Sequence, residues 1–287
     1  MDKRKLLVYL IVPAAVSLAL TAMYFSGNIV LQRIVCPKLP PLSPDAWREF
    51  GLLEGLQNVV LLALAGVACA GALRKRHALE RAAWAGLAVC TLFVFAEEID
   101  YGAHLRAYFF GGTEFNWFQP MREWPPELVG RIDLMAQPVN VHNQPGVNKV
   151  FKKAGDLLIG GVFVLLPLLA MRFRNKWLQY AAPDRYAILT VIAIVLLRSL
   201  THALGSWEES QVGTLRDLME AFQTGQAGDH AAALAAGREP GAISSNLSEF
   251  RELNFYYLLL VYCAGLVFCR RSPLEPEEVS GESSSND

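Results

Sequence analysis

Apolar residues along this chain are grouped into blocks, and each block is about as long as a lipid bilayer is thick. Two of the plainest blocks read "GDLLIGGVFVLLPLLAMRF" and "YAILTVIAIVLLRSLTHAL". A helix needs ~20 residues to cross the hydrocarbon core. Six blocks come near this length: roughly 6–26, 53–73, 82–98, 155–173, 185–204 and 254–269. The pattern predicts an all-α integral membrane protein, a bundle of about six transmembrane helices.

Two prolines, Pro13 and Pro167, fall inside predicted helices. Proline removes a backbone donor, but neighbouring helices can supply donors to the freed carbonyl groups in a membrane. The first block follows "MDKRK", as in a secretory signal peptide. Its apolar part is longer than the usual ~7–15 residues, and no clean small-x-small cleavage site follows it. We interpret it as a retained signal anchor.

Lys and Arg residues gather in four short segments, and six spans place all four segments on one side of the membrane. Short loops rich in Lys and Arg stay in the cytoplasm. Both termini are therefore predicted to be cytoplasmic. The four segments comprise Lys3, Arg4 and Lys5; Arg74, Lys75, Arg76 and Arg81; Arg172, Arg174, Lys176 and Arg185; and Arg270 and Arg271.

The long connections, 27–52, 99–154 and 205–253, then face the periplasm or the extracellular side. The second contains "FNWFQPMREWPPELV", and Trp and Tyr favour the membrane interface. This composition predicts a periplasmic cap over a single polytopic domain, residues 1–271. The polar end 272–287 has the composition of a disordered cytoplasmic tail.

Composition supports the membrane assignment and argues against a nucleic-acid-binding protein, a disulfide-rich protein and a cysteine metal site. Hydrophobic residues make up 53% of the chain and charged residues 18%, with a mean hydropathy of +0.27. The formal net charge is −1, which gives no general attraction to nucleic acid. The five cysteines are odd in number and have no CxxC spacing, so neither a disulfide framework nor a cysteine metal site is indicated.

Titratable residues cluster where the third apolar block ends, in "FVFAEEIDYGAH". Glu97, Asp100 and His104 are spaced i, i+3 and i+7, which would place them on one helix face, while Glu98 points to a neighbouring face. Ionised groups are costly against lipid, so this face should turn toward protein or water. The spacing predicts a polar site at the periplasmic end of the bundle.

The other predicted spans carry polar residues at the same end, and the opposite end shows no comparable set of carboxylates and imidazoles. These residues are Glu54, Gln57, Asn58, His142, Asn143, His202, Glu208, Glu209, Glu249 and Glu252. Most of the glutamates fit solvated interfacial side chains. Glu54 and Glu97 differ, because apolar residues flank them, and a buried carboxylate must be paired, protonated or coordinated.

Two chemistries fit this set, and the residues alone do not choose between them. Glu97, Asp100, His104, His142 and His202 offer the ligands of a hard or borderline divalent metal, the one candidate cofactor. In a metal-free site, one carboxylate would act as acid or base, oriented by His142 or His104. The chain has no HExxH, GxSxG, Walker or GxGxxG motif.

The order of three short stretches resembles an uncharacterised family of bacterial multi-spanning inner-membrane proteins. These stretches are "EFGLLEG", "EEIDYGAH" and "NVHN", similar to that family's EDGxxE, EEISWGQR and NxxNxHN motifs within residues 45–150. The chain departs at Phe50, Asp100, Tyr101, Ala103 and His104. The resemblance implies that Glu54, Glu97, Glu98, His142 and Asn143 belong to one site. It implies no reaction, because the family has no established activity.

The leading hypothesis is a membrane-embedded enzyme with a carboxylate and histidine site at the periplasmic face. It would be a hydrolase or transferase acting on a lipid or lipid-linked substrate, with membrane lipids as its surroundings. Glu97 would be general base or ligand, Glu54 its partner and His142 a proton shuttle or ligand. The alternative is a non-catalytic membrane subunit or small transporter, whose carboxylates form a structural network or a proton or cation path.

Overall fold

The computed structural model describes residues 2–35, 51–99, 147–173, 175–212, 242–270 and 272–274, and these residues form helices with no strand among them. Six helical stretches are long and apolar enough to cross a membrane, which confirms the predicted number of long apolar helices. They are Lys3–Tyr24, Leu52–Arg74, Ala78–Glu98, Lys153–Arg172, Ala187–Trp207 and Glu249–Cys269. The predicted periplasmic cap and tail fall largely on residues outside the described ranges.

Three of the six stretches contain a turn or more of wider π-helix. The elements in order are α1 (Lys3–Leu6), η1 (Leu7–Ile11), α2 (Val12–Tyr24), α3 (Ile29–Val35), α4 (Leu52–Arg74), α5 (Ala78–Glu98), α9 (Val147–Leu158), η3 (Ile159–Leu165), α10 (Leu166–Arg172), α11 (Lys176–Ala181), α12 (Ala187–Val212), α15 (Ala242–Ala264) and η4 (Gly265–Cys269), where η marks π-helix.

Two helices extend well into the segment 205–253 that the hydropathy pattern assigns to a loop. Helix α12 continues to Val212, and α15 begins at Ala242. The added turns are more polar than the apolar blocks, so a hydropathy pattern does not mark them. The earlier start of α15 places Glu249 and Glu252 inside a helix, where their positions relative to the other spans are fixed.

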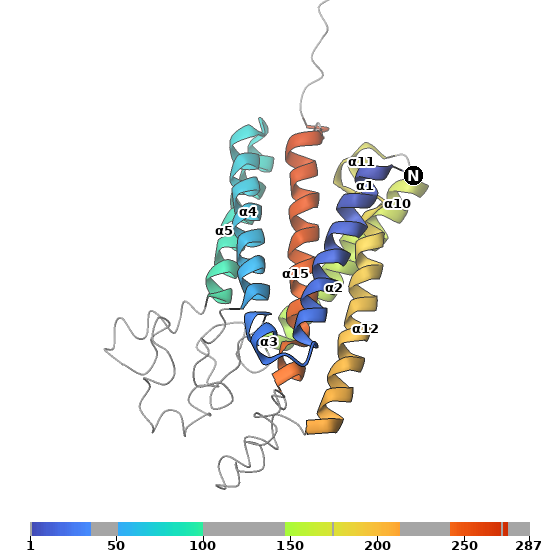
Figure 1. Ribbon diagram of the computed structural model, residues 1–287. Helices are drawn as coiled ribbons and strands as arrows, with labels where there is room; N and C mark the ends of the chain where they lie inside the picture. Colours follow the sequence, from blue (N-terminus) through green and yellow to red (C-terminus); the bar gives the residue numbers. More distant parts are fainter. Residues whose placement is uncertain are drawn as a thin grey trace, which may run out of the picture.

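Helix α15 is the central element of the bundle (Figure 1). It packs against α4 on one side and α12 on the other, and α4 pairs with α5 in a hairpin. The N-terminal helices η1 and α2 pack beside α12. The N-terminus, α11 and the end of α15 lie at one end of the bundle, and α3 and the start of α4 lie at the other (Figure 1).

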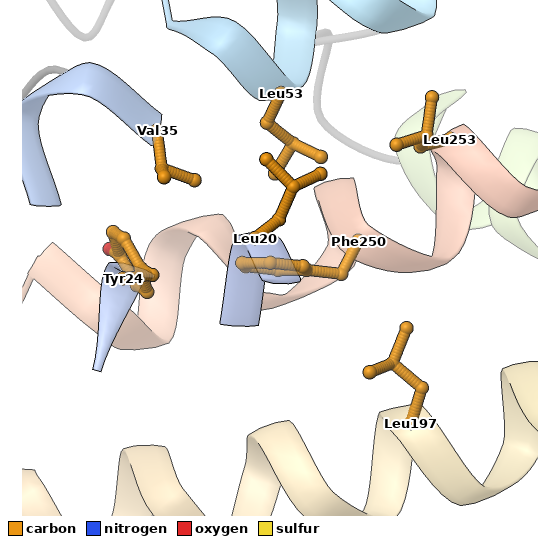
Figure 2. Close-up of a cluster of buried hydrophobic side chains, with 7 residues drawn as sticks. All are labelled: Leu20, Tyr24, Val35, Leu53, Leu197, Phe250 and Leu253. Atoms are coloured by element: carbon orange, nitrogen blue, oxygen red, sulfur yellow. The ribbon is translucent and has the colours of Figure 1, made fainter. Parts of the chain in front are cut away.

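A buried apolar cluster fixes the end of the bundle that carries the acidic residues (Figure 2). Leu53 and Phe250 are almost fully buried there. Leu53 directly precedes Glu54 in the sequence, and Phe250 directly follows Glu249. Phe250 packs on Tyr24 of α2 with ring centroids 5.8 Å apart. The cluster consists of Leu20, Tyr24, Val35, Leu53, Leu197, Phe250 and Leu253. Its packing sets which faces of α4 and α15 meet.

Pro13 shows how neighbouring helices supply the donors that a proline removes. Pro13 has no N–H, so it cannot bond the carbonyl of Tyr9, four residues earlier, or that of Val8, five residues earlier. The hydroxyl of Thr190 on α12 donates to the Tyr9 carbonyl, and the hydroxyl of Tyr257 on α15 donates to the Val8 carbonyl at 2.9 Å. The predicted tolerance of Pro13 therefore has a specific structural basis.

Thr190→Val is expected to lower the free energy of unfolding by about 1 kcal/mol, because it leaves the Tyr9 carbonyl without that donor. Tyr257→Phe should have an effect of similar size through Val8. Unfolding of the purified protein in mixed detergent measures both. Thr91→Val is the matched control, since the Thr91 hydroxyl donates only to Leu87 of its own helix. Equal losses in Thr190→Val and Thr91→Val would contradict this role of Thr190.

A polar network lies at the end of the bundle opposite the apolar cluster around Leu53 and Phe250. Glu80 of α5 accepts from the hydroxyl of Tyr180 at 2.9 Å and from Ser272 at 2.7 Å. Lys75, although 5% exposed, donates to the carbonyl of Arg270 at 3.4 Å. The sequence pattern did not indicate this network, because single charges near helix ends look like ordinary interfacial residues. It ties the α4–α5 turn to α11 and to the end of the last span.

Candidate functional site

Two helices bring carboxylates together at the end of the bundle where α5 ends and α15 begins its apolar part. Glu249, Glu252 and Tyr256 of α15 are spaced i, i+3 and i+7 and so share one helix face. Glu98 is the last residue of α5. One carboxylate oxygen from each of Glu98, Glu249 and Glu252 lies within 4.8 Å of the other two. We call these three residues the carboxylate cluster.

Helix α4 adds an amide to the carboxylate cluster. The Gln57 Nε2 donates to the backbone carbonyl of Glu249 at 2.9 Å and to its Oε2 at 3.1 Å. Gln57 is fully buried, and its Oε1 has no hydrogen-bond partner among the described residues. A buried amide oxygen without a partner is costly. Because the Nε2 of the same amide donates to Glu249, this oxygen is a further polar atom close to the carboxylate cluster.

Hydrogen bonds from two side chains, Tyr256 and Asn254, hold the acidic face of α15 in its orientation. The Tyr256 hydroxyl donates to Glu98 Oε1 at 2.8 Å, which links α15 to the end of α5. On another face of α15, the buried Asn254 donates to Ser17 Oγ of α2 at 2.7 Å and to the carbonyl of Phe250 at 2.8 Å. Asn254 therefore fixes the rotation of α15 against α2, and this rotation turns Glu249 and Glu252 toward α4 and α5.

The electrostatics of the carboxylate cluster call for a positive partner. Glu249 lies close enough to Glu252, Glu98 and Glu54 to be repelled by all three. The members of the cluster are half-buried, so water screens these repulsions less than at an open surface. Several carboxylates that share one site are stabilised by protons or by a cation. The site must therefore take up positive charge whenever it is fully ionised.

The geometry of the carboxylate cluster fits one hard cation. Oxygen ligands lie about 2.0–2.6 Å from Mg²⁺ or Ca²⁺, so oxygens that share an ion are at most about 5 Å apart. The 4.8 Å limit of the cluster meets this condition. All of its donors are oxygens, which suits Mg²⁺, Mn²⁺ or Ca²⁺ better than softer metals. The Gln57 Oε1 is a further oxygen of the same kind.

The structure brings some of the sequence-predicted residues to this end and leaves others apart. Glu98 is in the carboxylate cluster, Glu97 is 3% exposed in the last turn of α5, and Glu54 is half-buried near Glu249. His202 is exposed on α12 and contributes no ligand atom to the cluster. Four predicted residues lie outside the described ranges: Asp100, His104, His142 and Asn143.

Of the predicted helical face formed by Glu97, Asp100 and His104, only Glu97 lies within the described residues. Helix α5 ends at Glu98, and Ile99 has φ −92° and ψ 16°. Among the described residues, the polar face with i, i+3, i+7 spacing therefore lies on α15, where Glu249, Glu252 and Tyr256 form it, and not on α5. The sequence did carry the signal for it, as Glu249, Glu252 and Tyr256 in "EFRELNFY". A helix start at 254 hid that periodicity, so the two glutamates looked interfacial and Tyr256 was not indicated.

Comparisons of this chain with known proteins add no relative. No family model, no curated protein and no solved structure matches it. The resemblance of its three short stretches to a bacterial membrane family therefore stays a prediction, and the case for function rests on the residues themselves.

Proposed function

We propose that this chain is a multi-pass protein of a bacterial inner membrane, with both termini in the cytoplasm and the carboxylate cluster at the periplasmic end. The outer surface of the bundle supports the membrane placement. Large apolar side chains such as Val59, Val89 and Leu196 are more than 60% exposed. Only 11–33% of the most apolar part of each long helix is buried within the chain. So much exposed apolar surface is stable in lipid and not in water.

The proposed orientation rests on the positions of the basic segments. The N-terminus, α11 and the end of α15 share one end of the bundle (Figure 1), and each belongs to a segment rich in Lys or Arg. Such segments are retained in the cytoplasm. The carboxylate cluster lies where α5 ends and the last span begins, which is the other end.

We further propose that the carboxylate cluster binds a divalent cation of the Mg²⁺, Mn²⁺ or Ca²⁺ type. The observation that carries this proposal is the approach of oxygens from Glu98, Glu249 and Glu252 to within 4.8 Å. The unpartnered, fully buried Gln57 Oε1 beside them is a second, independent indication. A site of three glutamates and an amide differs from the histidine-containing set that the sequence suggested.

The proposed reaction is hydrolysis or group transfer on a lipid or lipid-linked substrate. At the end of a membrane helix, the site has the depth of the lipid headgroups. A bound divalent cation would polarise a phosphoryl or carbonyl oxygen or lower the pKa of a water molecule. Glu97 and Glu54, which flank the carboxylate cluster, would accept or return a proton.

A non-catalytic role is the second candidate, and the burial of Glu97 favours it. At 3% exposure, Glu97 is closed off from substrate in this conformation. Buried carboxylates in a bundle also serve as a helix-locking network or as a proton or cation path. In that case the protein would be a membrane subunit or a small transporter.

Binding of Mn²⁺ to the purified protein, followed by electron paramagnetic resonance, tests the proposed site directly. The expected result is one bound Mn²⁺ per chain, displaced by Mg²⁺ or Ca²⁺. Hydrolysis of lipid substrates that requires the ion and stops with a chelator would support the enzyme. Stoichiometric binding without any such turnover would favour the non-catalytic candidate. No saturable Mn²⁺ binding by the folded protein would remove the metal-assisted mechanism.

A further inference from the structure

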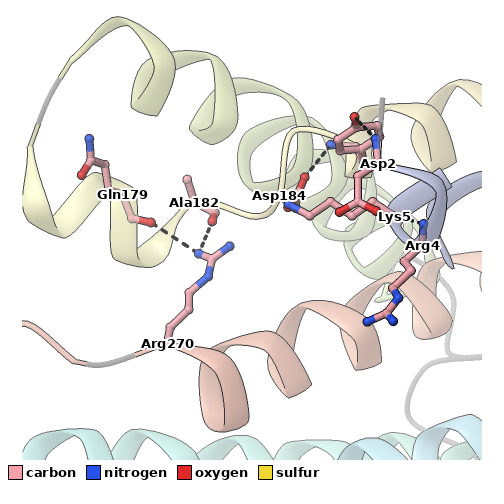
Figure 3. Close-up of polar contacts among 8 residues, drawn as sticks. Asp2, Arg4, Lys5, Gln179, Ala182, Asp184 and Arg270 are labelled. Atoms are coloured by element: carbon pink, nitrogen blue, oxygen red, sulfur yellow. Dashed lines mark hydrogen bonds and ion pairs between the residues drawn. The ribbon is translucent and has the colours of Figure 1, made fainter.

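A basic pocket lies at the end of the bundle opposite the carboxylate cluster. Figure 3 shows the polar contacts of Lys5, Asp184 and Arg270, which belong to its wall. It has a volume of about 270 Å³ and opens to the outside of the molecule. Its charged wall consists of Lys5 from α1, Asp184 and Arg185 before α12, and Arg270 after η4. Side chains of α10 and of the α11–α12 connection form the apolar wall. Segments far apart in the sequence thus join at one site.

The charge balance of the basic pocket is positive. Three cationic side chains face one carboxylate, and that carboxylate, Asp184, already forms an ion pair with Lys5. Partial burial raises the pKa of Asp184, but hydrogen bonds from Lys5 and the Tyr186 N–H, with the charges of Lys5 and Arg270, outweigh it and lower the pKa. Asp184 therefore stays ionised at neutral pH and offsets one of the three cations. The pocket keeps a net positive charge, which favours an anion.

The two arginines of the basic pocket differ in how they are held. Arg270 is fixed, because its Nη1 donates to the carbonyls of Tyr180 at 2.7 Å and Gln179 at 3.4 Å, and also to that of Ala182. An arginine carries three more N–H groups on Nε and Nη2, in the geometry that suits phosphate oxygens. Arg185 is exposed, with its guanidinium 5.6 Å from the centre of the Tyr186 ring. One cation is thus pre-positioned and one is free to close over an anion.

The apolar wall of the basic pocket continues onto the outer surface of the bundle. Met171, which lines the pocket, is 58% exposed, and Leu168, one turn earlier on α10, is 46% exposed. Phe173, which directly follows α10, and Trp177 of α11 are each 52% exposed. Aromatic side chains of this kind favour the membrane interface. A ligand that fits has a negative headgroup for the cations and an apolar tail for α10.

We propose that this basic pocket binds the phosphodiester headgroup of an anionic phospholipid, with the acyl chains lying along α10. The cations and the exposed apolar surface adjoin, and an amphiphile satisfies both, whereas a free phosphate uses only the cations. Basic pockets between transmembrane helices on the cytoplasmic side are suited to anionic headgroups. This site is separate from the carboxylate cluster, and the two proposals share only the membrane placement.

Titration of dioctanoyl phosphatidylglycerol into the purified full-length protein in a neutral detergent tests the proposal. The expected result is saturable binding of one lipid per chain. Dioctanoyl phosphatidylcholine, which has the same chains and no net charge, should bind at least about tenfold more weakly. Inorganic phosphate, which has the charge and no chains, should also bind at least about tenfold more weakly.

Arg185→Gln is the informative variant, because Arg185 is exposed and does not hold a helix end as Arg270 does. It should weaken phosphatidylglycerol binding about fivefold, and Lys5→Gln with Arg185→Gln roughly 25-fold. Arg76→Gln removes one exposed charge at the same end outside the pocket and should change the affinity less than about twofold.

Three outcomes would overturn the phospholipid assignment. Equal binding of phosphatidylcholine would show that the headgroup charge is not recognised. Phosphate that binds as tightly as phosphatidylglycerol and displaces it would make the ligand a free anion. Equal losses of phosphatidylglycerol affinity in Arg185→Gln and Arg76→Gln would show that the lipid responds to the overall positive charge of this end and not to the pocket. None of these results alters Mn²⁺ binding at the other end of the bundle, so the two proposals fail separately.

Discussion

Glu249→Gln is expected to lower the affinity of the protein for Mn²⁺ by at least about 10- to 100-fold, the loss that removal of even an outer-shell partner produces at a metal site. Glu249 is the member of the carboxylate cluster that is also hydrogen-bonded to Gln57 of α4. Its carboxylate accepts from Gln57 and lies near Glu98, Glu252 and Glu54. Glutamine keeps the size and the hydrogen-bonding ability of the side chain and removes its charge. The loss would therefore report on coordination, not on packing.

The same substitution should have opposite effects on stability with and without the ion. Without Mn²⁺, Glu249→Gln removes repulsion among close carboxylates, so the variant should unfold at the same or a higher temperature than the wild type. With Mn²⁺, the wild type gains stability by mass action and the variant does not. Thermal unfolding in detergent, at zero and at saturating Mn²⁺, measures both effects. The variant should have the same or the higher unfolding temperature without the ion, and the lower one with it.

Asp156→Asn is the matched control for the loss of one negative charge. Asp156 lies outside the carboxylate cluster, and its exposed side chain pairs with Arg251 of α15 at 3.1 Å. This variant should bind Mn²⁺ within about twofold of the wild type, since an exposed charge that is not a ligand is screened by salt. If Glu249→Gln and Asp156→Asn weakened Mn²⁺ binding equally, the carboxylate cluster would attract cations only as a charged surface and would not coordinate one.

The number of long helices was predictable because each apolar block has about the length that a helix needs to cross a bilayer. Their ends were less predictable. Hydropathy marks only the apolar part of a helix, and α15 begins at Ala242, well before the apolar block predicted from residue 254. Those turns are held by packing at Phe250 and by the hydrogen bond from Gln57 to the Glu249 carbonyl. Such tertiary contacts leave no mark on local hydropathy.

The site was partly predictable for a similar reason. Glu54, Glu97 and Glu98 stand out because carboxylates are costly inside or beside an apolar block. The spacing of residues along the sequence does not show which helices meet at the site. Helix α15 lies between α4 and α12, so its acidic face meets the ends of α4 and α5. Glu249 and Glu252 became site residues only through that packing, and Tyr256 through its bond to Glu98.

Gly71→Ala is expected to destabilise the protein by about 1–3 kcal/mol, the usual cost of overpacking a tight interface. Gly71 of α4 lies against Trp84 of α5, which is 8% exposed. A Cβ atom at Gly71 would lie 2.6 Å from Cδ2 and 2.8 Å from Cγ of the indole. Cγ is only two bonds from the α5 backbone, so a small rotation of the ring cannot relieve the contact. The two helices would have to separate.

Gly66→Ala supplies the matched control within the same helix. A Cβ at Gly66 would meet nothing within 4 Å, so this variant should stay within about 0.5 kcal/mol of the wild type. Unfolding in mixed detergent measures both variants. Trp84→Ala should abolish the added cost of Gly71→Ala in a double-mutant cycle, because the ring that causes the clash is gone. An unchanged cost in the Trp84→Ala background would place the defect elsewhere than in this helix contact. Because the α4–α5 hairpin also carries Gln57 and Glu98, separation of its helices should weaken Mn²⁺ binding at its far end as well.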